Sequence, residues 1–260
     1  MITAGIDVGL ENTKVVILKD GQVIGRSKGR TGGAARTANI TRIVQEALEE
    51  AKVASSEVER TIATGKGKHD ATMADDIYTE VATLIKAARF LYPDAEAVVD
   101  AGADETLIAT FHKTGNLKES AINQKCSAGI GTFLRYMADR LDLTQEEMSD
   151  LSPASPTGPT VSDGCVVFSE LDALSLLNRG TPAKEIASAI IETAAVRVST
   201  VIVEPTLPVG DKIVLAGGLS HNTAFVSALE KHTGSKFIIP GEAEYIGALG
   251  AALIAVPVSE

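Results

Sequence analysis

The chain has 260 residues, of which 45% are apolar and 22% are charged, and its formal net charge is −10. A chain of this length can form one large or two small domains with a sizeable core. The negative charge argues against a nucleic-acid groove or a surface for anionic membranes. Trp is absent and aromatic residues are few, so the core must consist of Ala, Val, Ile and Leu.

The sequence also bears on the compartment in which the protein works. No apolar run approaches the roughly 18 residues of a membrane-spanning helix. The N-terminal residues lack the basic region of a signal peptide and are expected to form a strand. We therefore expect a cytoplasmic protein. Two cysteines in a reducing compartment are more often buried thiols or ligands than a disulfide.

The first part of the chain alternates strands and helices. Apolar runs predict strands at residues 2–7, 13–18, from Val23 onward and at 61–64. Asp20-Gly21 predicts a tight hairpin turn, and residues 28–33 form a Gly-rich, basic link. Helical spacing of apolar residues predicts helices over 36–52 and 75–92, the second of which is stopped by Pro93.

The second part is richer in helices. Strands are expected from Val98, at 212–216 and at 236–239, and helices are expected at residues 133–141, 144–151, 166–178, 222–233 and 243–255. A further helix is expected to start with Thr181 as its N-cap and Pro182 in its first position and to run to about Val203.

One pattern occurs twice in this order. Aligning Asp7 with Asp100 also aligns Gly9 with Gly102 and Thr13 with Thr106, and a strand, a turn, a strand and a Gly hairpin follow in both copies. A single Asp-x-Gly can simply close a strand, but a matched offset in two copies indicates an internal duplication. The sequence therefore predicts an α/β protein with two similar lobes.

Two of the turns have the composition of a phosphate site. Gly lets backbone N–H groups approach an anion, and Thr and Lys add donors and positive charge. The two acidic residues that open the turns would act through Mg²⁺ and its waters, because like charges repel. Asp104 or Glu11 could orient the attacking water. The predicted site residues are Asp7, Gly9, Glu11, Asn12, Thr13 and Lys14 in the first turn and Asp100, Gly102, Ala103 and Asp104 in the second.

A third turn follows the strand at 212–216. Gly217-Gly218 would let a flat base or ribose lie against bare backbone. In this order the three turns resemble those of the actin, hexokinase and heat-shock chaperone ATPase superfamily over nearly the whole chain. The resemblance implies a two-lobed actin/hexokinase-like ATPase fold with duplicated βββαβα units that closes on Mg-ATP. The lobes would comprise residues 1–95 plus 243–260 and residues 96–242.

Each cysteine precedes a predicted helix. Cys126 lies in Lys-Cys-Ser-Ala-Gly-Ile-Gly and Cys165 lies in Asp-Gly-Cys-Val-Val-Phe. A helix N-terminus favours the thiolate, which is the form that binds metals. Each could instead be a small buried residue.

The number of ligands narrows the choice of metal. A 4Fe-4S cluster takes four thiolates, whereas this chain has two, and its four His residues show no zinc-ligand spacing to either cysteine. A twofold homodimer would double Cys126 and Cys165 to four. The hypothesis is one shared cluster on the dimer axis.

These motifs together resemble a narrower family. An ATPase of this fold with Lys-Cys-Ser-Ala-Gly-Ile-Gly-Thr-Phe-Leu and, about forty residues later, Cys-Val-Val-Phe-Ser-Glu is similar to the activators of 2-hydroxyacyl-CoA dehydratases, the ATP-binding subunits of benzoyl-CoA reductase and the reductases of double-cubane proteins. Residues 63–67 and 244–252 also match that family. The resemblance implies one 4Fe-4S cluster between two subunits, a ferredoxin or flavodoxin as electron donor, and a transient complex with the enzyme that receives the electron.

The second turn departs from the pattern of that family. Gly-Gly-Gln-Asp is usual after the first Asp, whereas this chain has Gly102-Ala103-Asp104-Glu105. The change leaves open which residue positions water. Two rival functions remain. One is a small-molecule kinase of the same fold that uses Asp104 as its base, and the other, suggested by the altered turn, is a non-redox regulatory subunit that binds nucleotide.

Overall fold

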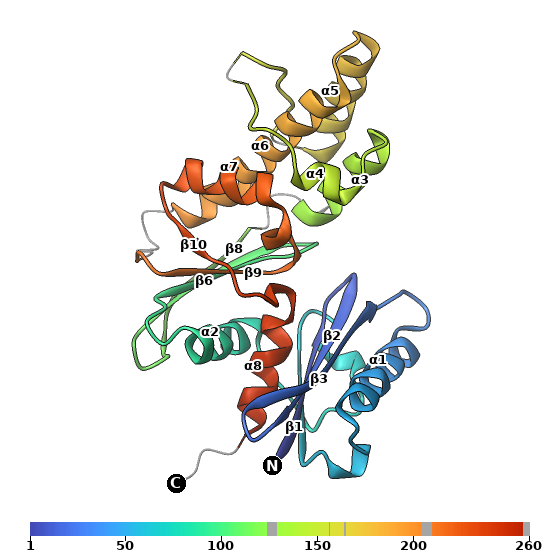
Figure 1. Ribbon diagram of the computed structural model, residues 1–260, viewed down its shortest axis with the longest axis vertical. Helices are drawn as coiled ribbons and strands as arrows, with labels where there is room; N and C mark the ends of the chain where they lie inside the picture. Colours follow the sequence, from blue (N-terminus) through green and yellow to red (C-terminus); the bar gives the residue numbers. More distant parts are fainter. Residues whose placement is uncertain (124–128, 156, 164, 204–209, 257–260) are drawn as a thin grey trace. The chain divides into compact units, whose positions relative to one another are not determined.

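The computed structural model describes residues 1–123, 129–155, 157–163, 165–203 and 210–256. The chain divides into two compact units, residues 1–95, 111–117 and 244–260 in the first and 96–110 and 118–243 in the second. Each unit contains a five-stranded mixed sheet with helices packed on it (Figure 1). Among the described residues, no helix combines the length and the apolar character that crossing a bilayer requires.

The first sheet has the strand order β3-β2-β1-β4-β5. Its strands are β1 (Ile2–Val8), β2 (Asn12–Lys19), β3 (Gln22–Arg30), β4 (Arg60–Thr64) and β5 (Asp76–Ile77). The helices of this unit are α1 (Arg36–Ala51), α2 (Glu80–Leu91) and α8 (Ile246–Ala255), with short 3-10 helices η1 (Ser55–Glu57) and η2 (Lys68–Asp70), and η4 (Ala243–Tyr245) leads into α8.

The second sheet has the order β10-β9-β6-β7-β8. Its strands are β6 (Ala97–Ala101), β7 (Thr106–Phe111), β8 (Leu117–Asn123), β9 (Ile213–Ala216) and β10 (Phe237–Ile238). The helices of this unit are α3 (Ile130–Arg140), α4 (Gln145–Ser149), α5 (Val166–Asn178), α6 (Ala183–Ile202) and α7 (Thr223–Thr233), with the 3-10 helix η3 (Gly218–His221).

The two sheets follow one plan, as the repeat predicts. In each, an antiparallel hairpin of the first two strands continues into a third strand, and a later strand joins the first in parallel. Gly9 N donates to Asn12 O over 3.1 Å, and Gly102 N donates to Glu105 O over the same distance. The two acidic turns therefore share both their place in the sheet and their closing hydrogen bond.

The period of two along β1 determines which residues reach the site. Ala4 and Ile6 pack in the apolar core on the side of α1. The alternate residues face α8, which lies beside β1 (Figure 1). There the Thr3 hydroxyl donates to Ala252 O, and a Cβ on Gly5 would lie 2.0 Å from Ala248 O. Because successive side chains point to opposite faces, Asp7 also lies on the α8 face.

Three predicted element boundaries were wrong. Residues 75–79 are not helical, because Asp76–Ile77 pairs in parallel with β4 and the Thr79 hydroxyl accepts from Ala82 N to cap α2. Pro182, with ψ 136°, is itself the N-cap of α6. The expected link at residues 28–33 is strand as far as Arg30, because β3 pairs with β2 along its length.

Candidate functional site

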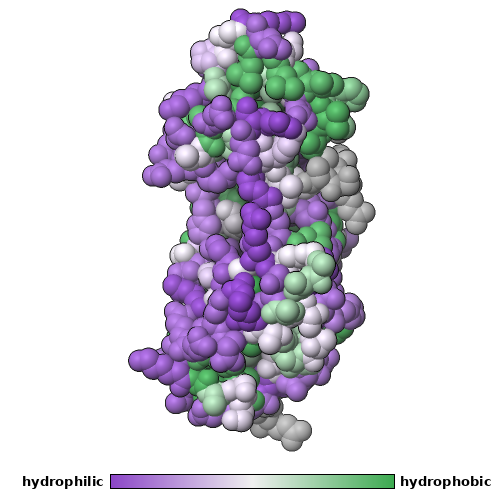
Figure 2. Space-filling view, turned by 90° about the vertical axis from the view of Figure 1, so that its right-hand side faces the viewer, coloured by the Kyte–Doolittle hydropathy of each residue, from purple (hydrophilic) through white to green (hydrophobic). Residues whose placement is uncertain are grey.

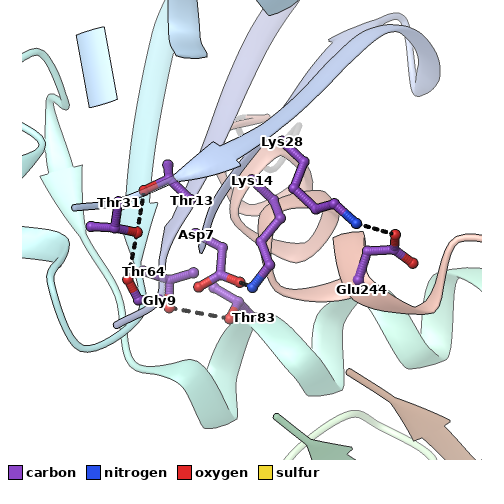
Figure 3. Close-up of polar contacts among 9 residues, drawn as sticks. All are labelled: Asp7, Gly9, Thr13, Lys14, Lys28, Thr31, Thr64, Thr83 and Glu244. Atoms are coloured by element: carbon purple, nitrogen blue, oxygen red, sulfur yellow. Dashed lines mark hydrogen bonds and ion pairs between the residues drawn. The ribbon is translucent and has the colours of Figure 1, made fainter. Parts of the chain in front are cut away.

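The first acidic turn holds an ion pair. Asp7 lies opposite Lys14 in the β1–β2 register, and Lys14 Nζ lies 3.1 Å from Asp7 Oδ2 (Figure 3). Their side chains are 16% and 20% exposed, respectively. A Cβ on Gly247, in α8, would lie 3.1 Å from Asp7 Oδ2, so the start of that helix packs against the carboxylate. The turn therefore presents a carboxylate and an amino group that are both held in place and both partly exposed to solvent.

The Thr13 hydroxyl is used inside this turn. Thr13 is fully buried, and its Oγ1 lies 2.9 Å from Thr31 Oγ1. Thr31 Oγ1 donates in turn to Gly9 O over 2.7 Å, so the proton between the two threonines comes from Thr13 (Figure 3). The backbone also contributes, because Thr31 N donates to Glu11 O over 2.8 Å. Thr13 therefore stabilises the turn through buried hydrogen bonds to Thr31 and, through it, to Gly9. The sequence did not predict this role.

Gly65 completes the first turn and was missed as a site residue. Asp7 pairs in parallel with Thr64, the last residue of β4. Gly65 follows with φ +89°, and a Cβ there would lie 2.6 Å from Asp7 Oδ1. Its position in the sequence could have indicated this role. Gly65 directly follows a strand, as Gly217 directly follows β9.

The second and third turns meet in the second unit. Asp100 pairs in parallel with Ala216, the last residue of β9. Gly217 follows with φ +86°, and a Cβ there would lie 2.4 Å from Asp100 Oδ1. A Cβ on Gly218 would meet no atom within 4 Å. The structure thus gathers Asp100, Gly102, Gly217 and Gly218 at one edge of this sheet, with Ala103 and the half-buried Asp104 beside them.

Other charges surround the first turn. Lys28 Nζ, on β3, lies 3.0 Å from Glu244 Oε1 (Figure 3). Lys66 Nζ lies 3.7 Å from Glu80 Oε2. These pairs join the strand ends to the starts of α8 and α2. Asp7 and Asp100 lie in different units, so their action on one nucleotide stays a prediction.

Of the two cysteines, the structure describes Cys165, and Cys126 lies outside the described residues. Cys165 is the N-cap of α5, as predicted, and its thiol is free and half-buried. Within the described ranges, no three His, Cys, Asp or Glu side chains gather as a set that could hold a metal. A free thiol at a helix start fits one ligand of a cluster whose other ligands come from elsewhere.

The start of α3 is attached to the second turn. Thr132 N donates to Ala103 O over 2.9 Å. A Cβ on Gly129 would lie 2.2 Å from Ala103 O, and one on Gly131 would lie 2.8 Å from Gly102 O. The backbone that follows the Cys126 segment therefore packs directly on the turn, which is possible because both residues lack a side chain.

Helix α5 carries an exposed apolar face. Val167, Phe168, Leu171 and Leu174 are 61%, 61%, 56% and 39% exposed. Figure 2 shows hydrophobic side chains gathered in the upper part of the view, at the height of α3 and α5 in Figure 1. We call Val167, Phe168, Leu171 and Leu174 the α5 face. An exposed apolar face of this kind is typical of an interaction site.

Comparison with known proteins gives a consistent result. The model of the BadF/BadG/BcrA/BcrD ATPase family matches residues 4–255. The chain is 31% identical over 255 residues to the (R)-2-hydroxyglutaryl-CoA dehydratase activating ATPase of Acidaminococcus fermentans, covering 97% of this chain and 96% of that protein.

Solved structures agree. The activator of the 2-hydroxyisocaproyl-CoA dehydratase from Clostridium difficile, with bound ADPNP, superposes with a TM-score of 0.90 at 27% identity and covers 98% of this chain and 94% of that one. A ROK family glucokinase from Streptomyces griseus matches with a TM-score of 0.64 at 13% identity, covering 98% and 99% of the two chains, which shows a shared fold alone. The predicted actin/hexokinase-like fold is confirmed, and the chain belongs to the BadF/BadG/BcrA/BcrD ATPase family.

Proposed function

We propose that this protein is an ATP-dependent one-electron donor. It would couple ATP hydrolysis to the transfer of a low-potential electron from a 4Fe-4S cluster, shared by two copies of the chain, to a partner enzyme. The partner would be a 2-hydroxyacyl-CoA dehydratase, a benzoyl-CoA reductase or a double-cubane enzyme, and a ferredoxin or flavodoxin would supply the electron. The named relatives, which are dehydratase activators, support this class of partner.

The observation that carries the proposal is the position of Cys165. Its free, half-buried thiol sits at the N-terminus of α5. The α5 face starts two residues later. A second copy of the chain would cover this face and bring a second Cys165 close, and Cys126 of each copy would complete four thiolates. When bound, such a cluster stores and releases single electrons.

The nucleotide would be handled by the three turns. Asp7 and Asp100 would hold Mg²⁺ through its waters, and Lys14 would neutralise phosphate charge. Asp104 or Glu11 would orient the water that attacks. Gly218, whose backbone is bare, would lie against the base or ribose. We add Gly65 to the predicted site residues, because its backbone packs directly against the Asp7 carboxylate.

The link between nucleotide and cluster would run through α3. This helix is fixed to the second turn by the Thr132–Ala103 hydrogen bond, and the segment before it contains Cys126. A change at the turn on ATP binding or hydrolysis would therefore move the start of α3. The two states must bind nucleotide with unequal affinity for this coupling to work.

The proposal is tested by iron and ATP turnover together. Protein purified and reconstituted without oxygen should be brown with about four irons per dimer, as one cubane requires, and Cys165→Ser should lose the iron. Asp7→Ala should abolish ATP turnover, whereas Glu49→Ala, an exposed carboxylate on α1, should not.

Other outcomes would identify the rivals. A colourless, iron-free protein after reconstitution would refute the cluster. Phosphorylation of a small-molecule hydroxyl that survives Cys165→Ser would indicate a kinase. Nucleotide binding without any turnover, alone or with a partner, would indicate a regulatory subunit.

A further inference from the structure

Arg197, on α6, holds the segment that leads into Cys165. Its Nε donates to Asp163 O over 2.5 Å, and its Nη2 donates to Ser162 O over 3.4 Å and to Ser169 Oγ over 3.3 Å. The Ser169 hydroxyl lies 2.5 Å from Ser162 O and 3.1 Å from Cys165 O. One guanidinium and one buried hydroxyl thus hold the carbonyls of Ser162 and Asp163, which precede the cysteine, and the carbonyl of Cys165 itself.

The same arginine contacts the elements next to the other cysteine. Its guanidinium carbon lies 5.4 Å from the centre of the Phe133 ring on α3. Its backbone carbonyl accepts from Asn123 Nδ2 over 3.2 Å, and Asn123 is the last residue of β8, directly before residues 124–128. Arg197 is therefore joined to the entry of the Cys126 segment, to the helix that follows it, and to the Cys165 segment.

A cavity of about 200 Å³ lies next to the residues that make these contacts. Arg197, Asn123 and Asp163 line it together with Asp104 and Thr106 of the second hairpin. Thr106 is 1% exposed, and its Oγ1 has no hydrogen-bond partner among the described residues. Its counterpart in the first hairpin, Thr13, bonds to Thr31. A cavity of this size has room for several waters, and one within hydrogen-bond distance of Thr106 Oγ1 would satisfy the hydroxyl.

We propose that Arg197 is a positioning residue for the cluster. It sets the place of the Cys165 sulfur by anchoring the backbone of Ser162 and Asp163 on α6 and, through Ser169, that of Cys165, and its positive charge raises the reduction potential of the group that the sulfur binds. The effect on the reduction potential rests on the proposed function, whereas the positioning of the sulfur does not. The planar fork of Arg suits several acceptors at once, and Lys cannot reproduce it. Net charge and hydrogen bonds near a cluster set its potential.

The first test needs no metal. The full chain, freed of iron, is treated with iodoacetamide, and alkylation of Cys165 is followed by mass spectrometry of its peptide. Arg197→Lys retains the charge but loses the fork, and Ser169→Ala removes the buried hydroxyl without adding volume. Both should raise the alkylation rate of Cys165 at least about threefold, because the segment is released. Arg179→Lys, at the exposed end of α5, is the matched control and should leave the rate unchanged.

The second test uses the iron-loaded dimer. Arg197→Gln should lower the midpoint potential of the cluster, measured by EPR-monitored titration, whereas Arg197→Lys should leave it near that of the parent. Alkylation rates in Arg197→Lys and Ser169→Ala within twofold of the parent would overturn the positioning role. If the parent binds no iron, the proposed function fails, but the alkylation rates still decide whether Arg197 holds Cys165.

Discussion

At the scale of single residues, glycines at strand ends define the site. Gly65 and Gly217 each follow a parallel strand with positive φ, and each packs against an acidic side chain that opens a turn. L-residues with side chains rarely adopt this conformation, and a Cβ would also strike the carboxylate. The same solution in both units indicates that the acidic turns are held by bare backbone.

Gly217 and Gly218 make a matched pair for experiment. Gly217→Ala should lower the free energy of unfolding by roughly 2–4 kcal/mol, because it combines a strained φ with a clash on Asp100 and Ala101. Gly218→Ala meets no atom and should change stability by less than about 0.5 kcal/mol. Urea unfolding followed by circular dichroism measures both.

Gly218→Ala also tests the nucleotide prediction. If a base or ribose lies on this backbone, the added methyl should weaken binding of ADPNP at least about tenfold in calorimetry, although the fold is intact. Unchanged affinity would show that the nucleotide does not use Gly218.

Glu192 gives a pH dependence with a defined sign. Burial opposes ionisation of this carboxyl, but hydrogen bonds from Lys231 and His232 outweigh burial and hold its pKa below the usual 4.5. Because the folded-state pKa is depressed, the ion pair stabilises the fold above about pH 4.5, and this stability is lost as pH falls through the lowered value.

Glu192→Gln should therefore cost about 0.5–1 kcal/mol at pH 7, a magnitude limited by solvent screening. The difference between the parent and the variant should shrink toward zero below pH 4.5 in urea unfolding series. Asp139→Asn, an exposed carboxylate on α3, should show no such trend. A difference that grows at acid pH would contradict the assignment.

At the scale of elements, α5 differs from the other helices of its unit. Its buried residues are Ser169 and Ala173 alone, whereas α6 buries eleven side chains. The helix is apolar on its exposed side as well, and an isolated monomer would leave that surface in water. The proposed dimer would remove it.

The α5 face is tested by a charge. Leu171→Glu should raise the dissociation constant of the dimer at least about tenfold, because it places a carboxylate in an apolar contact. Sedimentation equilibrium measures the constant. Phe90→Glu, on α2 and also half exposed, is the control and should leave it unchanged. Equal dissociation constants for Leu171→Glu and the parent would assign the face to another partner.

At the scale of the whole molecule, one strand plan is used twice, with different additions. The first unit needs one helix, α1, between its third and fourth strands, whereas the second inserts α3 to α6 between β8 and β9. Both the exposed α5 face and Cys165 belong to this insertion. A duplicated nucleotide fold thus carries its proposed redox part in one copy only.

Iron removal tests that division of labour. If four thiolates from two copies share one cluster, anaerobic treatment with a chelator should weaken the dimer at least about tenfold, because the covalent bridge is lost and the α5 face alone remains. The unfolding transition of each unit should change little, since no strand that the structure describes contains a cysteine. Light scattering before and after chelation measures the mass, and a dimer of unchanged affinity would contradict the shared cluster.

Sequence by itself determined the features that depend on neighbouring residues. The two Asp-x-Gly hairpins and the Asp20-Gly21 turn, with both φ values positive, follow from short-range rules of alternation and turn chemistry. The extent of α5, directly after Cys165, was also predicted from the local sequence. The internal repeat extended these local signals to the plan of both sheets.

Tertiary structure alone decided the features that join distant segments. Residues 76–77 form a strand because β4 offers them a parallel partner. The Thr13 hydroxyl turns to Thr31, and Gly65 closes on Asp7 across 58 positions of sequence. Arg197 meets Asp163 and Phe133 because α6 packs against both α3 and α5. Such contacts depend on which surfaces pack against one another in the folded chain, and the local sequence pattern does not predict that packing.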